Sequence, residues 1–365
     1  MKRLFDVALI LAVAVMVAVE GTYGFGLFRH WTFVSLMILL MLSLCYQAVS
    51  DWKEGKYVPL LSHLGLSLVI LGGLAGSLDD FHGEISVSRG SDECMAYEEN
   101  GDSLQLPFSV RLKEFRIDYY EDGSSPKQYS STVFIDGREF TTGVNHPFRY
   151  RGYRFYQYSY DDEDGMVSVL LVVHDRWLPV LAVGAILLVL AAFAGLKVTW
   201  RSWKMLVAAL VLATAFTLLS IARISFGTLM PALRSLWFIP HIIIYMLAYA
   251  VLALAVIFGI ISCITPKVKP ELSGRLLSTS SSLLLAGMIC GAFWAQQAWG
   301  DYWTWDAKEC WAAATWLLTL AGTHAGSRRR AFAVTLTVLS FLAMQITWYG
   351  VNYLPSSDLS MHTYK

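Results

Sequence analysis

Long apolar stretches alternate with short polar segments along most of the 365-residue chain. A helix that crosses a lipid bilayer needs roughly 20 mostly apolar residues. Stretches of this kind predict about nine transmembrane helices, at residues 6–27, 31–49, 58–77, 177–196, 203–221, 237–264, 278–298, 311–327 and 331–350. The first stretch imitates a secretion signal. It has no convincing small-x-small cleavage site, so we predict a retained helix.

Residues 78–176 break this pattern. They carry most of the acidic residues, and they contain short runs of β-branched and aromatic residues with Gly, Asp and Ser between them, such as EISVSR, FSVRLKEFRIDYY, YSSTVFID, YRFYQYSY and VSVLLVVHD. Runs that alternate in this way are typical of β-strands. The sequence therefore predicts a polytopic α-helical membrane protein with an external β-rich domain inserted between its third and fourth transmembrane helices.

Composition agrees with this class and excludes others. Apolar residues make up 56% of the chain and charged residues only 15%, which is typical of membrane proteins. The formal net charge is zero, so no global charge favours nucleic-acid binding. No two of the five cysteines form a CxxC pair, so neither a thioredoxin-type redox pair nor a zinc site is indicated.

The basic residues predict an orientation in the membrane. If the N-terminus is cytoplasmic, the inner loops hold most of the lysines and arginines, including the cluster at 328–330. The outer short segments then hold only Arg29, Arg223, Arg234, Lys308 and Lys365. Positive charge is retained on the cytoplasmic side, so we predict that the β domain and the C-terminus are external.

Four histidines fall near the predicted membrane boundaries. His63 and His324 lie about one turn inside the cytoplasmic ends of the third and eighth spans. His241 follows Pro240 at the outer end of the sixth span, and His362 lies in the external tail. Two neutral imidazoles can fill both axial positions of a haem iron, so an inner and an outer ligand pair are indicated. A single histidine at a helix end is more often a capped or interfacial residue.

The sequence WAQQAWGDYWTWDAKECWAAATW, residues 294–316, contains six tryptophans interleaved with acids and a lysine. If this stretch forms a short interfacial helix, Trp299, Tyr302, Trp303 and Asp306 share one face by their spacing. That face would offer flat rings to a planar apolar ligand such as a porphyrin. An aromatic belt at the membrane surface is the competing interpretation.

Two further residues favour a ligand at this stretch. Gly300 would leave room for close approach. Lys308, or the indole N–H groups, could bind the two porphyrin carboxylates.

The same residues carry a resemblance to a known family. WGDYWTWDAKECW resembles WGxYWxWDxKExW, the WWD signature of the haem-handling proteins of cytochrome c assembly. WFIPHIIIYMLAYA, TWLLTLAGTHAGSRRR and GVNYLPSSDLSMHTY resemble the histidine segments of CcsA in the System II pathway. LSHLGLSLVILGGLAGS and VNHPFRYRGYRFYQYSYDDE resemble segments of its partner ResB. The chain thus resembles a natural ResB–CcsA fusion, a System II cytochrome c synthetase.

The resemblance implies an organisation of the chain and a cellular location. It implies ResB-like transmembrane helices over 1–77, an external ResB-like β-rich domain over 78–176, a fourth helix that closes the ResB-like part over 177–196, and a CcsA-like part with the WWD loop and external tail over 197–365. It also implies an integral protein of the bacterial inner membrane, with the WWD loop on the periplasmic side.

The resemblance implies a function as well. Haem b would be taken up at His63 and His324 and carried outward to the WWD stretch, where His241 and His362 would bind its iron. An apocytochrome c bearing CxxCH would then be joined to it by thioether bonds, which is the activity of a holocytochrome c synthase, or cytochrome c haem lyase. His241 and His362 would act in catalysis together with Trp299, Trp303, Trp305 and Asp306. The haem-binding set would further include Gly300, Tyr302, Lys308, Glu309 and Trp311.

The sequence departs from the family pattern at several points. Ala307 stands where proline is usual, Cys310 is an unusual thiol inside the signature, and SMHTY replaces the typical GLHSY around His362. The external domain is also much shorter than a typical ResB domain. Because the chain has no thiol pair, external thiol-reducing proteins are expected as partners.

Three other functions compete with haem attachment. A haem exporter or chaperone would bind and deliver haem without attaching it. A quinone-linked cytochrome b is disfavoured, because such proteins commonly place an inner and an outer histidine on one helix, whereas here the candidates lie on separate segments. A structural membrane protein with an aromatic belt would bind no haem.

Overall fold

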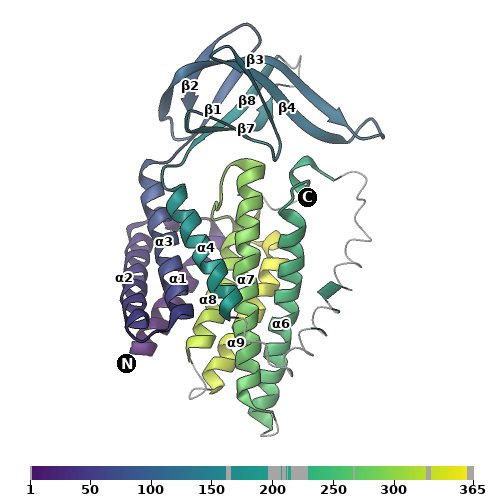
Figure 1. Cartoon of the computed structure of the whole chain (residues 1–365). Helices are drawn as coiled ribbons and strands as arrows, with labels where there is room; N and C mark the ends of the chain where they lie inside the picture. Colours follow the sequence, from purple (N-terminus) through teal and green to yellow (C-terminus); the bar gives the residue numbers. More distant parts are fainter. Residues whose placement is uncertain are drawn as a thin grey trace.

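The computed structural model describes residues 2–161, 166–195, 229–265, 268–325 and 330–359, together with the isolated residues 207, 211, 213 and 214. These residues form a bundle of long helices with a β domain at one end (Figure 1). The bundle helices within the described ranges are α1 (Lys2–Tyr23), α2 (Trp31–Lys53), α3 (Tyr57–Asp79), α4 (Leu178–Gly195), α6 (Phe238–Ile264), α7 (Pro270–Trp299), α8 (Ala307–Ala325) and α9 (Arg330–Trp348). The prediction of an α-helical membrane protein with an inserted β domain is confirmed.

Seven of these described helices are long and apolar enough to cross a membrane, and α8 is not among them. The predicted span 203–221 lies almost entirely outside the described residues. Helix α8 packs against α1, α7 and α9 and buries most of its length. A helix enclosed by other helices is shielded from lipid, so α8 can carry polar residues that a lipid-facing helix cannot.

Close helix packing at glycines ties the inserted domain to the bundle. Helix α3 leads into the β domain, α4 leads out of it, and the two helices pack side by side. A side-chain carbon on Gly65 of α3 would lie 2.9 Å from the Gly184 carbonyl oxygen, and one on Gly184 of α4 would lie 2.8 Å from the Gly65 oxygen. Small residues of this kind allow backbones to approach closely inside a membrane. The two supports of the β domain therefore form one packed pair.

The β domain is a single antiparallel sheet of eight strands in the order β5-β4-β3-β2-β1-β8-β7-β6. The strands are β1 (Phe81–Ser88), β2 (Glu93–Tyr97), β3 (Ser103–Tyr119), β4 (Pro126–Ile135), β5 (Arg138–Gly143), β6 (Phe148–Tyr150), β7 (Tyr153–Tyr160) and β8 (Val167–His174). The sheet curls so that β4 meets β7 across its interior, where the Ser131 hydroxyl donates to Gln157 Oε1 at 2.6 Å. The interior is filled by alternate apolar residues such as Ile85, Val87 and Val110.

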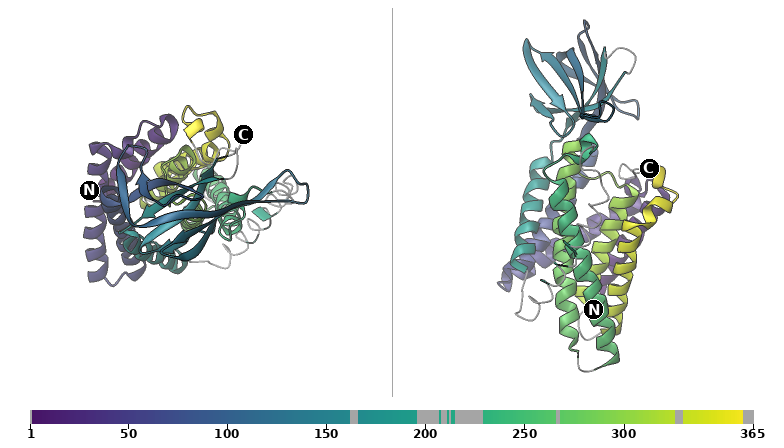
Figure 2. Two further views of the ribbon diagram at one scale, coloured as in Figure 1. Left: turned by 90° about the horizontal axis from the view of Figure 1, so that it is seen from above. Right: turned by 90° about the vertical axis from the view of Figure 1, so that its right-hand side faces the viewer.

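The β domain covers the end of the bundle that is opposite the start of α1 (Figures 1 and 2). The hairpin between β3 and β4 reaches the segment that precedes α6, where the Tyr120 hydroxyl donates to the Leu229 carbonyl at 2.9 Å. Asn145 Nδ2, after β5, donates to the carbonyl of Pro231 at 2.7 Å in the short 3-10 helix η3 (Pro231–Leu233). The β domain thus contacts the segment that precedes α6.

Candidate functional site

The loop between α7 and α8 carries the tryptophan-rich signature, and it is not helical. Helix α7 ends at Trp299, because Gly300 turns the chain with a φ of 93°, in the left-handed region that favours glycine. Residues 301–306 then form an irregular segment before α8 begins at Ala307. The expected short helix with Trp299, Tyr302, Trp303 and Asp306 on one face is therefore wrong.

Two acidic side chains of the signature hold the loop against the start of α8. The Asp306 carboxylate accepts a hydrogen bond from the Glu309 backbone N–H at 2.8 Å, which is the bond expected of a helix N-cap. The Glu309 carboxylate accepts from the Thr304 N–H at 2.7 Å and from the Thr304 hydroxyl at 3.1 Å. Both acids are buried. Their hydrogen bonds fix the backbone of the loop at Thr304 and at the start of α8. Lys308 lies within electrostatic range of Asp306.

The tryptophans divide between two clusters. Trp305 stacks on Phe28 with ring centroids 6.2 Å apart, and it meets Phe33 edge-on at 5.2 Å. Trp303 lies beside Trp305, with ring centroids 6.0 Å apart. This first cluster joins the loop to α2 and to the connection between α1 and α2.

The second cluster surrounds His241 on α6. Trp299 meets Trp294 edge-on with ring centroids 5.4 Å apart, and Trp294 lies 5.8 Å from the imidazole of His241. Tyr245 meets the same imidazole edge-on, with ring centroids 4.9 Å apart. Of the predicted signature residues, Trp299 is the one that this cluster brings toward His241.

A backbone carbonyl fixes the orientation of His241. The ring donates from Nδ1–H to the Gly287 carbonyl of α7 at 2.9 Å, so the lone pair is on Nε2. Gly291 makes room for the ring, since a side-chain carbon there would lie 2.7 Å from His241 Nδ1. Metal-binding histidines usually donate their second ring N–H in this way. His241 can therefore present Nε2 to an iron atom.

Two indole N–H groups of the signature are buried without an acceptor among the described residues. They belong to Trp303 and Trp311. The indole N–H of Trp316, further along α8, is buried without an acceptor in the same way. A buried donor that makes no hydrogen bond costs free energy. A ligand with carboxylate or carbonyl oxygens would supply acceptors for such groups.

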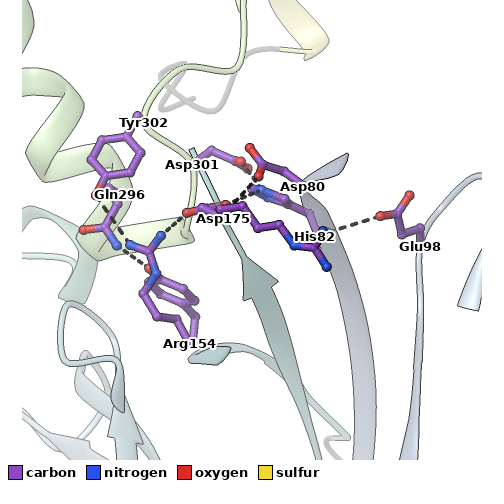
Figure 3. A network of polar contacts seen from close by, with 10 residues as sticks. Asp80, His82, Glu98, Arg154, Asp175, Gln296, Asp301 and Tyr302 are labelled. Atoms are coloured by element: carbon purple, nitrogen blue, oxygen red, sulfur yellow. Dashed lines mark hydrogen bonds and ion pairs between the residues drawn. The ribbon is translucent and has the colours of Figure 1, made fainter. Parts of the chain in front are cut away.

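The first half of the loop is bonded to the β domain by the polar network of Figure 3. Asp301 of the loop lies 2.8 Å from Nδ1 of His82 on β1, and Asp175 lies 3.2 Å from Nε2 of the same ring. Asp175 also pairs with the buried Arg154, whose Nη1 donates to the Tyr302 hydroxyl at 3.4 Å. Five residues from the loop, β1, β7 and the end of β8 thus form one connected network.

The charges around His82 favour its protonated form. Burial lowers the pKa of this imidazole, but the hydrogen bond and the charge of Asp301 outweigh it, with smaller contributions from Asp80 and Glu98. The net effect raises the pKa of His82 above its usual value. The contact between His82 and Asp301 is therefore an ion pair at mildly acidic pH.

One apolar contact and one hydrogen bond also join the end of α7 to the β domain. A side-chain carbon on Gly300 would lie 2.8 Å from Leu171 Cδ2 of β8, so the space beside this glycine is taken by the β domain. Gln296 of α7 hydrogen-bonds the Tyr156 hydroxyl of β7. Burial raises the pKa of Tyr156 to about 12. The close approach expected at Gly300 is thus made by a neighbouring strand.

At the other end of the bundle His63 and His324 lie within electrostatic range of each other. They lie on α3 and α8, close enough that a charge on one ring acts on the other. His63 Nδ1 lies 2.7 Å from Asp51 Oδ2, and His324 Nδ1 lies 2.8 Å from the Leu320 carbonyl. Each ring therefore donates from Nδ1, which leaves the lone pair on Nε2.

His362 lies outside the described residues, so its distance to His241 is not defined. The last described segment, η6 (Ser357–Leu359), is at the β-domain end of the bundle (Figure 1). Just before it, the Ser356 hydroxyl donates to the Gly21 carbonyl at 2.7 Å. The chain therefore reaches the β-domain end of the bundle three residues before His362.

Several residues of these sites were missed by the sequence reasoning. They are Asp51, His82, Arg154, Gly287 and Gly291, which act through the histidines or through the loop. The i, i+4 spacing of Gly287 and Gly291 on a predicted helix was a usable signal of close packing. Asp51 at the inner end of a predicted span was another. Nothing local pointed to His82 or Arg154.

Comparison with known proteins identifies the two halves of the chain. The ResB-like family model matches residues 55–176, and the Cytochrome C assembly protein model matches residues 169–357, which is more than half of the chain.

Several curated relatives share the name cytochrome c biogenesis protein CcsA. The one from Guillardia theta is 27% identical over 218 residues, covering 47% of this chain and 70% of the relative. The one from Pyropia yezoensis is 30% identical over 192 residues, covering 37% and 59%. The one from Gloeobacter violaceus is 41% identical over 98 residues, covering 26% and 28%, so this chain spans less than two thirds of the latter two. The chain therefore belongs to the cytochrome c assembly protein family, and it joins a ResB-like part to a CcsA-like part in one polypeptide.

Proposed function

We propose that this protein carries haem b across the bacterial inner membrane and attaches it to apocytochrome c. Family membership gives the general role, which is cytochrome c biogenesis. In the proposal, His63 and His324 bind haem near the cytoplasmic end of the bundle. His241 and His362 bind it at the outer end, below the signature loop and the β domain.

The main support is the geometry around His241. Its ring is fixed by the Gly287 carbonyl, and its lone pair is on Nε2. Trp294 and Tyr245 contact the ring, and Trp299 packs against Trp294. An imidazole of this tautomer beside flat rings suits an iron porphyrin. The inner histidines show the same pattern of Nδ1 hydrogen bonds, which supports a second site.

The proposed reaction is the addition of two thiols of a CxxCH segment to the two vinyl groups of haem. Each sulfur bonds to the vinyl carbon next to the ring, and the thiol hydrogen goes to the terminal carbon. The addition consumes no oxidant or reductant. The protein contributes by holding iron, vinyl groups and thiols together, an effect worth about 7–11 kcal/mol in the most favourable cases.

In this proposal the signature residues act mainly by shaping the outer site. Trp299 lines it, while Asp306 and Glu309 hold the loop and Trp303 and Trp305 anchor it on α2 and the α1–α2 connection. Trp303 and Trp311 also offer indole N–H groups to haem oxygens. Of the remaining predicted haem contacts, Tyr302 and Lys308 would act at the rim of the loop. Gly300 is not assigned a haem contact, because Leu171 occupies the space beside it.

The proposal also assigns an orientation and a partner. The N-terminus is cytoplasmic, and the β domain, the signature loop and the C-terminus are periplasmic, in line with the distribution of basic residues. All five cysteines are free thiols, and no two lie in a CxxC pair. External thiol-reducing proteins would therefore keep the substrate cysteines reduced.

One experiment separates attachment from transport. The protein is purified to record its haem spectrum, then co-expressed with a CxxCH apocytochrome in a bacterial host that lacks its own cytochrome c assembly system. Haem that stays bound to the apocytochrome after denaturation supports the proposal. A substrate with both cysteines replaced by serine is the control. Bound haem without a covalent product would instead identify a haem exporter or chaperone, and a colourless protein would refute both.

A further inference from the structure

We propose that Asp51 is the positioning residue of the inner haem site, because it orients His63 and strengthens His63 Nε2 as an iron ligand. This inference rests on the proposed function, since it assigns a role toward the haem bound by His63 and His324. At the opposite end of the described bundle, the Gly287 carbonyl accepts the hydrogen bond from His241 Nδ1.

The contact is short and sheltered. Asp51 lies near the C-terminal end of α2, and His63 lies in the second turn of α3. Asp51 Oδ2 is 2.7 Å from His63 Nδ1, and the two side chains are only 14% and 16% exposed. Hydrogen bonds to a charged acceptor are stronger than those between neutral groups, and more so away from water.

The contact decides which nitrogen can bind iron. A carboxylate accepts a hydrogen bond but cannot donate one, so the proton is on Nδ1 and the lone pair is on Nε2. The negative charge of Asp51 also attracts this proton, which raises the electron density of the ring and makes Nε2 a stronger iron ligand. A carbonyl partner does this less, and Nδ1 of His324 and of His241, the other two candidate ligands within the described residues, contacts a carbonyl.

The turn between α2 and α3 does not need this side chain to hold it. The backbone already closes the turn, with Glu54 N–H donating to Ser50 O at 3.0 Å and Lys56 N–H to Asp51 O at 2.9 Å. A carboxylate placed near a membrane boundary is costly without a partner. Its placement against His63, which lies within electrostatic range of His324, is explained by ligation.

The neighbouring carboxylate offers a matched control. Asp6 of α1 is buried and lies within electrostatic range of His63, and its recorded hydrogen bond is with the Ser43 hydroxyl at 3.3 Å. Ser43→Ala therefore removes a polar contact from α2 close to the site but leaves the contact between Asp51 and His63 intact.

The test uses the full-length protein with His241→Ala, so that bound haem reports the inner site. Asp51→Asn keeps the shape of the side chain and removes its charge. We expect about ten- to hundredfold weaker haem binding in this variant. We also expect a more positive reduction potential and a changed electron paramagnetic resonance spectrum of the ferric haem, because a weaker donor stabilises ferric iron less. Ser43→Ala should match the parent in all three measurements.

A second measurement remains informative if Asp51→Asn does not fold. Asp51→Glu keeps the charge and displaces the carboxylate. We expect the reduction potential of its haem to lie between those of the parent protein and the Asp51→Asn variant. Haem affinity, potential and spectrum that are identical to the parent in both variants would overturn the role of Asp51 alone. A parent protein without haem would instead refute the proposed function.

Discussion

Asp301, in the loop between α7 and α8, lies 2.8 Å from Nδ1 of His82 on the first strand of the β domain. The contact joins the ResB-like part to the signature loop of the CcsA-like part. It explains how an inserted domain far from the tryptophans in sequence can set the position of their loop.

The His82–Asp301 pair predicts a dependence of stability on pH. The pKa of His82 is raised in the folded protein, so the stabilisation is fully present below its ordinary pKa of about 6.5 and is lost as the pH rises through the raised value. We expect the apparent Tm in detergent to fall over that window by about 2–4 °C. His82→Gln should remove this part of the pH dependence. His146→Gln, at an exposed histidine of the same domain, should keep it.

Arg154 predicts a large effect of one substitution. Its side chain is 5% exposed and pairs with Asp175, so Arg154→Ala leaves this buried carboxylate without the guanidinium and with the His82 ring at 3.2 Å beside it. We expect a loss of about 3–5 kcal/mol in the stability of the β domain, measured by chemical denaturation. The matched control is Arg151→Ala, which breaks an exposed pair with Asp136 and should cost about 0–1 kcal/mol. Equal effects of the two substitutions would contradict this account of the network.

Gly291 predicts a specific effect on outer haem ligation. Gly291→Ala would place a carbon 2.7 Å from His241 Nδ1, so the ring must move away from the Gly287 carbonyl. We expect at least about tenfold weaker haem binding at the outer site, measured spectroscopically in a His63→Ala background. Gly274→Ala, on the same helix with open space around it, should behave like the parent. A normal spectrum from Gly291→Ala would show that His241 does not need this orientation.

Substitution of Gly300 tests how closely the β domain packs against the loop. Gly300→Ala forces alanine into a φ of 93° and drives its side chain into Leu171. Gly101→Ala imposes nearly the same strain, at a φ of 92°, in open space. Backbone strain should cost each variant about 1–2 kcal/mol. Only Gly300→Ala should also weaken the contact between the loop and the β domain, which we expect to detect as faster proteolysis of the β domain. Equal proteolysis of both variants would contradict the close contact between Gly300 and Leu171.

The structure shows which parts of this fold are local properties of the sequence. The transmembrane helices and the strands could be predicted, because the periodicity of apolar residues in a helix or a strand depends on residues that are close in sequence. Helix α8 was predicted as a span at 311–327 and is a helix, but only packing against α1, α7 and α9 explains its polar residues. The short helix expected in the signature loop was wrong, because Gly300 ends α7 and Asp306 begins α8.

The sequence by itself determined the membrane class, the inserted β domain and the candidate histidines, since each follows from residue type and spacing along one segment. Only the tertiary structure decided that Trp305 packs on Phe28 while Trp299 lies in the His241 cluster, and that Asp51 meets His63. It also decided that the β domain is bonded to the loop. These contacts join residues on different elements, and their geometry depends on how whole helices and strands pack rather than on any local pattern.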